Sequence, residues 1–205
     1  MAKAKRARRI GILGGSFDPV HNAHVALARI ALDHLQLDEL LWVPAGQAWQ
    51  KTRRLADAKH RAAMVQLAIE GEPRFRLERC ELDRPGPSYT LDTVRELQLR
   101  TPNAEWFLVL GQDQYANLHT WHSSRELLDR VTIAVAGRAG DEPKPSAELA
   151  ALPHRALPLP LPAMPVSATE IRHLIELGDA ASMRKVADVV PAAVARYIAR
   201  HHPYS

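Results

Sequence analysis

Short apolar runs alternate along this chain with segments in which apolar residues recur at helical spacing. The alternation extends from residue 9 to about residue 137. Because parallel strands are joined by crossovers that are usually helices, this pattern predicts a parallel sheet built from crossover units. A length of 205 residues with 46% hydrophobic residues suits one such domain. We therefore expect a doubly wound α/β fold.

The individual elements follow from the same pattern. The expected strands span residues 9–13, 40–43, 75–80, 106–110 and 131–136, with an edge strand or extended loop at 156–161. The expected helices span 57–69, 91–99, 168–177 and 191–201, and one more follows the first strand. Residues 1–8 are interpreted as a flexible basic leader and residues 9–205 as a single domain. Within that domain, 9–137 form the core, and 138–205 form a proline-rich connection and the closing helices.

Composition narrows the class of protein. No run of about 18 apolar residues offers a membrane span, and the basic start Met1–Arg9 lacks the apolar region of a secretory signal, so we expect a cytoplasmic protein. The single cysteine, Cys80, excludes an internal disulfide, and its place in the expected third strand predicts a buried thiol. The basic start is more typical of a solvated leader than of a nucleic-acid arm, because only 5% of residues are aromatic.

The stretch Gly14–His24, GGSFDPVHNAH, follows the first expected strand. It has no Lys-Ser or Lys-Thr pair for a P-loop and no third glycine for a dinucleotide fingerprint. The glycines allow a sharp turn, and Asp18-Pro19 resembles a helix N-cap followed by a first-turn proline. His21 and His24 would face the same side of that first turn. Their N–H groups, and positive charge when protonated, suit a phosphate chain at a helix N-terminus.

Metal binding is the alternative for paired histidines, but it requires more ligands than this stretch supplies. A second constellation, Ser167–Arg172, combines a capping box, in which Ser167 pairs with Glu170, with groups that suit phosphate. Since a real cap leaves fewer N–H donors free, we expect Thr169 and Arg172 to contribute most.

Three further loops follow expected strands or precede an expected helix. In 44–51, Lys51 is a ligand candidate and Trp49 a weaker one. In 86–92, Ser88 or Thr90 is expected to cap a helix. After residues 111–113 comes Trp121, whose ring could stack on a flat heterocycle. Ligands of open parallel sheets bind at the carboxyl ends of strands, so these loops are expected to converge there.

Two signatures together make the chain similar to the nucleotidyltransferase superfamily. Members carry Gly-x-Phe-Asp-Pro-x-His-x-Gly-His and a later Ser-x-Thr-x-x-Arg, which here read Gly15–His24 and Ser167–Arg172. Ala23 replaces the usual glycine, and Ala168 stands where many members have serine. From residue 9 to about 197 the chain resembles the bacterial nicotinate-nucleotide adenylyltransferase family, with matches at 44–51, 87–90, 111–113 and Trp121.

This resemblance implies a Rossmann-like nucleotidyltransferase fold and an enzyme of NAD biosynthesis. The enzyme would transfer AMP from ATP to nicotinate mononucleotide, giving deamido-NAD and pyrophosphate. The implied catalytic residues are His21, His24 and Arg172. The implied ATP ligands are Gly15, Ser16, Phe17, Asp113, Ser167 and Thr169. The implied mononucleotide ligands are Lys51, Tyr89, Thr90 and Trp121.

The sequence leaves the metal, the acceptor and the oligomeric state open. Mg²⁺ is expected to arrive with ATP, because no carboxylate cluster in the sequence suits a permanent metal site. The same chemistry on nicotinamide mononucleotide or another phosphate acceptor is an alternative, as is a non-catalytic nucleotide-binding protein. We expect ATP and nicotinate mononucleotide as partners, no membrane or nucleic acid, and a monomer or homodimer.

Overall fold

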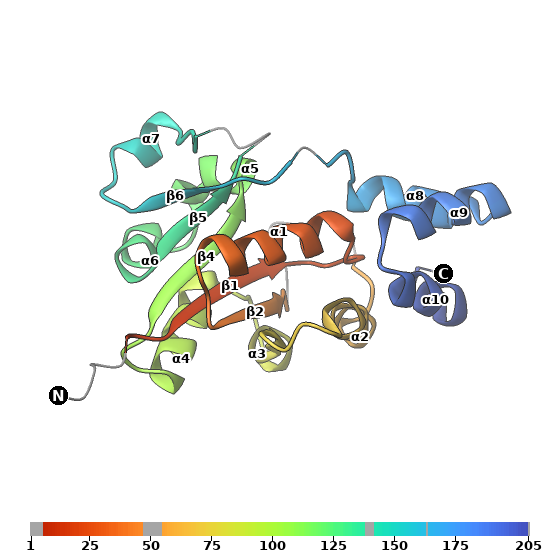
Figure 1. Ribbon diagram of the computed structural model, residues 1–205, viewed down its shortest axis with the longest axis horizontal. Coiled ribbons are helices and arrows are strands. Elements are labelled where there is room, and N and C mark those ends of the chain that lie inside the picture. Colours follow the sequence, from red (N-terminus) through yellow and green to blue (C-terminus); the bar gives the residue numbers. More distant parts are fainter. Residues whose placement is uncertain (1–5, 47–54, 138–141, 163, 205) are drawn as a thin grey trace. The chain divides into compact units, whose positions relative to one another are not determined.

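The computed structural model describes residues 6–46, 55–137, 142–162 and 164–204. Six strands within these residues form one sheet in the order β3-β2-β1-β4-β5-β6 (Figure 1). The pairs β1–β4, β4–β5 and β5–β6 run parallel. This is the strand order of Rossmann-type doubly wound folds, in which the direction of winding reverses at β1. The predicted fold class is confirmed.

Each predicted strand is present, with small differences in its ends. The strands are β1 (Arg9–Gly15), β2 (Glu39–Pro44), β3 (Phe75–Leu77), β4 (Glu105–Gly111), β5 (Thr132–Ala136) and β6 (Ala156–Leu159). The third is shorter than predicted, because the Glu78 carboxylate accepts a hydrogen bond from the Cys80 N–H at 2.9 Å and a helical turn starts there. Cys80 is buried as expected, but it begins the short helix α3 (Cys80–Asp83) instead of ending a strand.

The helices include several that the sequence pattern did not predict. Those predicted are α1 (Asn22–His34), α2 (Ala58–Ile69), α4 (Thr90–Arg100), α8 (Ala168–Leu177) and α10 (Ala192–His201). Those missed are α5 (Gln112–Ala116), the 3₁₀ turn η1 (Leu118–Thr120), α6 (Ser124–Arg130), α7 (Ala147–Ala150) and α9 (Ala180–Val189). Across the described parts of the chain, no helix is long and apolar enough to cross a membrane.

Helix α9 corrects the expectation that two helices close the chain. Gly178 adopts a left-handed conformation, with φ of 67°, and ends α8. The next residue, Asp179, then accepts hydrogen bonds from the N–H groups of Ala181 and Ser182, which caps a new helix. The residue that ends α8 and the residue that caps α9 are adjacent in the sequence, so the second helix starts without a longer loop between the two.

The chain divides into two compact units, each built from separate segments. The first unit comprises Met1–Leu13, Ala28–Leu41 and Tyr89–Pro162. The second comprises Gly14–Leu27, Trp42–Ser88 and Ala163–Ser205. In the second unit, α8 packs on α9, α9 on α10, and α10 on α2, where a hydrogen bond joins His60 and Tyr197 at 2.8 Å. The division at residue 137 that the sequence suggested stays a prediction.

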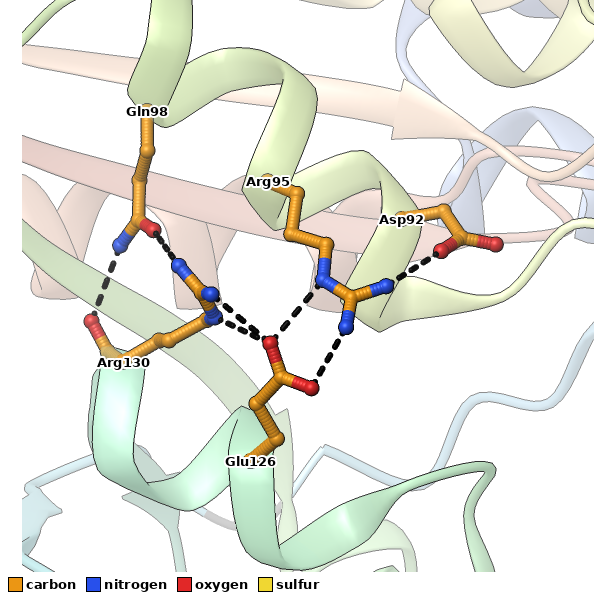
Figure 2. A network of polar contacts seen from close by, with 5 residues as sticks. All are labelled: Asp92, Arg95, Gln98, Glu126 and Arg130. Atoms are coloured by element: carbon orange, nitrogen blue, oxygen red, sulfur yellow. Dashed lines mark hydrogen bonds and ion pairs between the residues drawn. The ribbon is translucent and has the colours of Figure 1, made fainter.

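A polar network joins α4 and α6 in the first unit (Figure 2). Arg95 donates to both carboxylate oxygens of Glu126, at 3.0 and 2.5 Å, and Arg130 donates to the same group at 2.9 Å. The hydrogen bonds from Arg95 and Arg130 lower the pKa of Glu126. Gln98 exchanges hydrogen bonds with Arg130, at 3.1 and 3.0 Å. The network thus links α4 to α6, the helix that follows the Trp121 loop.

The central strands should contribute strongly to stability. Leu108 of β4 is 1% exposed, whereas Leu99 of α4 is 84% exposed. We expect Leu108→Ala to lower the free energy of unfolding by about 2–5 kcal/mol, because it leaves a cavity in a closely packed core. Leu99→Ala should change it by less than about 0.5 kcal/mol. Urea unfolding of both variants measures the difference, and equal effects would contradict the placement of Leu108 in the core.

Candidate functional site

The glycine turn, residues Gly14–Asp18, includes the last two residues of β1 and leaves the strand in a constrained conformation. A Cβ added to Gly14 would meet no heavy atom within 4 Å, so the backbone there is open to close approach. Phe17 is 1% exposed and adopts φ of 46°, a left-handed conformation that is strained for a bulky residue. Its ring lies against the indole of Trp42, with ring centres 5.3 Å apart. Surrounding contacts must therefore hold this turn.

Asp18 and Pro19 do not start the helix, contrary to the prediction. They are joined by a cis peptide bond, and α1 begins only at Asn22. Asp18 is fully buried, and its carboxylate accepts a hydrogen bond from the backbone N–H of Ala56 at 3.2 Å. The carboxylate therefore makes a contact with a distant segment, and the residue lies too far ahead of the helix to cap it.

The two histidines lie together, as their spacing predicts. Their rings stack with centres 3.7 Å apart and planes inclined by 24°. His21 immediately precedes α1, and its backbone N–H donates to Nδ1 of His24 at 3.2 Å. This is the arrangement of a capping box, with an imidazole where glutamate usually accepts. Because Nδ1 accepts, the neutral His24 ring carries its proton on Nε2 and presents that N–H as a donor.

His21 differs from the prediction in its charge. Burial lowers the pKa of its imidazole to about 4, so the ring is neutral near pH 7. The positive charge that a protonated ring would add is therefore not expected at this residue near pH 7. Nδ1 of His21 is buried and has no hydrogen-bond partner among the described residues. Such an atom at a candidate site is a place for a ligand or an ordered water.

The Ser167–Arg172 segment meets the glycine turn directly. Ser167 caps α8 as predicted, its hydroxyl accepting from the Glu170 N–H at 3.1 Å. Arg172 donates to the backbone oxygen of Asp18 at 2.7 Å and to the hydroxyl of Thr169 at 2.9 Å. The two sequence signatures are thus joined by one guanidinium group, and Thr169 lies beside it.

Arg61 of α2 is a residue that the sequence reasoning missed. It is 2% exposed and donates from Nε to the Ala56 carbonyl and from Nη1 to the Ser16 carbonyl, both at 3.0 Å. Burial lowers the pKa of Arg61, and the charge of Asp18 opposes that effect. Its position in the sequence could have indicated this burial. Arg61 precedes Val65 by four residues and Ile69 by eight, which places all three on the buried face of the helix.

Four further predicted site residues, Asp113, Trp121, Tyr89 and Thr90, lie in the first unit. Asp113 is exposed in the first turn of α5, immediately after β4. Trp121 is half-buried in the loop between η1 and α6. The Tyr89 ring stacks on His122, with centres 4.4 Å apart. Tyr89 precedes α4, which begins at Thr90 without any side-chain cap, so the predicted cap by Ser88 or Thr90 is wrong. Lys51 and Trp49 lie outside the described residues.

Relatives of known description match almost the whole chain. Residues 12–174 match the cytidylyltransferase-like family model. A Methylibium petroleiphilum protein described as a "probable nicotinate-nucleotide adenylyltransferase" is 59% identical over 98% of this chain and 95% of its own length. Proteins of the same description from Albidiferax ferrireducens and Bordetella petrii are 47% and 45% identical, over 96% of this chain and 98% and 99% of their own lengths.

Solved structures share the fold. The Plasmodium falciparum nicotinic acid mononucleotide adenylyltransferase complexed with NaAD has a TM-score of 0.75 and 19% identity, covering 95% of this chain and 96% of that one. The same enzyme complexed with APC has a TM-score of 0.73 and 18% identity, with the same coverage. At this level of identity, the likeness concerns the fold alone.

The lowered pKa of His21 should make stability depend on pH. Between pH 6.5 and about 4 the unfolded chain binds a proton at this residue, whereas the folded chain does not. The free energy of unfolding should therefore fall on acidification through this range, by up to about 3 kcal/mol from His21. Urea unfolding at several pH values measures it.

Two variants test whether His21 is the source of that dependence. His21→Gln should flatten the dependence between pH 4 and 6.5, because glutamine does not titrate. His34→Gln, at the exposed end of the same helix, should keep the wild-type dependence. An unchanged slope in His21→Gln would show that the buried imidazole does not contribute.

Proposed function

Since this chain belongs to the nicotinate-nucleotide adenylyltransferase family, we propose that it transfers AMP from ATP to nicotinate mononucleotide. The products are deamido-NAD and pyrophosphate, which places the reaction in NAD biosynthesis. The structural observation that carries the proposal is the hydrogen bond from Arg172 to the Asp18 carbonyl, which brings the two nucleotidyltransferase signatures together. The fold and the full-length similarity to the relatives support it.

The reaction suits a site that aligns and neutralises anions. An oxygen of the mononucleotide 5′-phosphate attacks the α-phosphorus of ATP, a P–O bond forms, and the bond to the β-phosphate oxygen breaks. Pyrophosphate leaves with the electron pair of that bond. The attacking phosphate is already a nucleophile, so the protein needs no activated Ser, Cys or Lys. Positioning and electrostatic stabilisation then account for catalysis.

The second unit holds the groups that we assign to the ATP phosphates. Arg172 is the permanent positive charge of this set, and Thr169 adds a hydroxyl beside it. His24 offers its Nε2–H, held in direction by the bond to Nδ1. His21 acts as a neutral ring. Backbone groups of Gly15, Ser16 and Phe17, together with Ser167 at the start of α8, complete the assigned set.

The first unit holds the described groups that we assign to the sugar and the pyridine ring. Asp113, at the start of α5, offers an exposed carboxylate to ribose hydroxyls. Trp121 offers a half-buried aromatic face. Tyr89 and Thr90 lie at the start of α4, where N–H groups favour a carboxylate. Lys51 is kept as a proposed ligand on the basis of the sequence alone.

We assign Mg²⁺ to the ATP itself. The described residues contain no group of three His, Cys, Asp or Glu side chains that could hold a metal ion. Mg²⁺ is commonly bound through substrate phosphates and water, with few protein ligands. When bound, it neutralises phosphate charge, alongside Arg172.

A pyrophosphate-release assay tests the proposed reaction. Purified protein is mixed with Mg·ATP and either nicotinate mononucleotide or nicotinamide mononucleotide. We expect release with both substrates present, and higher kcat/KM for the nicotinate form. Preference for the amide would correct the acceptor. No release with either acceptor, together with binding of ATP, would support a non-catalytic nucleotide-binding protein instead.

Substitutions at the ATP-phosphate residues should affect turnover more than folding. His24→Ala should lower kcat by about 10²–10³-fold, because it removes an oriented donor to the reacting phosphates. Arg172→Ala should raise the KM for ATP, because it removes the guanidinium charge. Steady-state kinetics and thermal melting measure both effects. His34→Ala, at the exposed end of α1, serves as the control with unchanged kcat. Wild-type turnover in His24→Ala would remove His24 from this role.

A further inference from the structure

Arg61 holds a backbone segment that contains the proposed ATP ligands. Its guanidinium donates to the Ser16 carbonyl at 3.0 Å, and Arg172 donates to the Asp18 carbonyl at 2.7 Å. The carbonyls on both sides of Phe17 are therefore each held by an arginine. Phe17 itself has φ of 46°, a conformation that persists only where the surroundings enforce it. Arg61 supplies one of the contacts that enforce it, alongside Arg172 and the packing of the ring on Trp42.

The conformation of Phe17 bears directly on His24. The Phe17 ring meets the His24 ring edge to face, with centres 5.1 Å apart and planes inclined by 74°. A Cβ added to Gly15 would lie 3.1 Å from the Phe17 ring, so the ring also packs closely on the backbone of the turn. A change of conformation at Phe17 would displace both the turn and the face on which His24 rests.

Arg61 also connects the turn to the segment that precedes α2. Its Nε donates to the Ala56 carbonyl at 3.0 Å, while the Ala56 N–H donates to the Asp18 carboxylate at 3.2 Å. Ala56 is thus held on both sides, once by Arg61 and once by the turn. Because a planar guanidinium offers donors in fixed directions, one side chain can hold Ser16 and Ala56 at the same time, which a lysine ammonium does less well.

From these contacts we propose that Arg61 is a positioning residue for the adenylyl transfer: it fixes the backbone of Ser16–Asp18 and thereby the orientation of His24. Because Arg61 is 2% exposed, we assign its role to the backbone that it holds and not to contact with the nucleotide. The inference rests on the proposed function only for its kinetic test. Because a misplacement of about 1 Å at a reacting group can cost about 10²-fold in rate, the effect of Arg61 should appear in kcat.

The test compares Arg61→Lys and Arg61→Met with Val65→Ala. Val65 lies on the same helix, is fully buried and has no hydrogen-bonding group in its side chain, so its truncation destabilises α2 without removing a hydrogen bond to the turn. We expect Arg61→Lys to lower kcat by about 10²-fold with a smaller change in the KM for nicotinate mononucleotide. Arg61→Met should be lower still. Val65→Ala should lower the melting temperature and keep kcat when assayed well below that temperature.

A second measurement does not depend on turnover. Nitrogen-15 NMR of the histidine side chains reports the tautomer and surroundings of His24. We expect the His24 signals to move in Arg61→Lys and to stay in place in Val65→Ala. If the wild type itself releases no pyrophosphate, the proposed function fails and the His24 signals alone decide the role of Arg61.

Three outcomes would overturn the proposal. One is a kcat within about threefold of wild type in Arg61→Lys. Another is an equal loss of kcat in Val65→Ala, which would assign the effect to destabilisation of α2. The third is unchanged His24 signals in Arg61→Lys. Should Arg61→Met fail to fold, Arg61→Lys gives the result.

Discussion

The hydrogen bond from Arg172 to the Asp18 carbonyl is the contact on which the proposed ATP site depends. It joins residues 154 positions apart in the chain, one in the turn after β1 and one in α8. Helix α8 has its own capping serine and ends at Gly178, so its local structure does not require the turn. The guanidinium of Arg172 therefore holds the two segments together, and the Thr169 hydroxyl accepts a hydrogen bond from the same guanidinium.

Near pH 7 the positive charge beside the glycine turn comes from Arg172 and Arg61, and His21 adds none. The low pKa of His21 follows from its burial, and the neutral ring stacks on His24 without the repulsion that two imidazolium groups would have. Guanidinium groups stay protonated even where they are buried, as Arg61 is. The arginine part of this set therefore keeps its charge over the range in which histidine normally titrates.

Much of the fold could be predicted from the sequence, because the buried face of each helix or strand requires apolar residues at regular spacing along the chain. The strands and the helix at 168–177 were placed closely, and Ser167 was identified as a cap. The cis bond at Pro19 and the start of α1 at Asn22 were missed, since Asp18 is held by Ala56, a partner that local patterns do not reveal. Arg61 was overlooked for the same reason: its two partners are backbone carbonyls, which carry no side-chain signature.

The bond from the His21 N–H to Nδ1 of His24 gives the imidazole a fixed polarity. One nitrogen accepts from the helix start, so in the neutral ring the other nitrogen is the donor. A donor N–H at this nitrogen can bind an acceptor such as a phosphate oxygen. It cannot bind a group that only donates, such as an ammonium ion. The first turn of α1 thus favours a hydrogen-bond acceptor beside His24, independently of the charge or shape of the ligand.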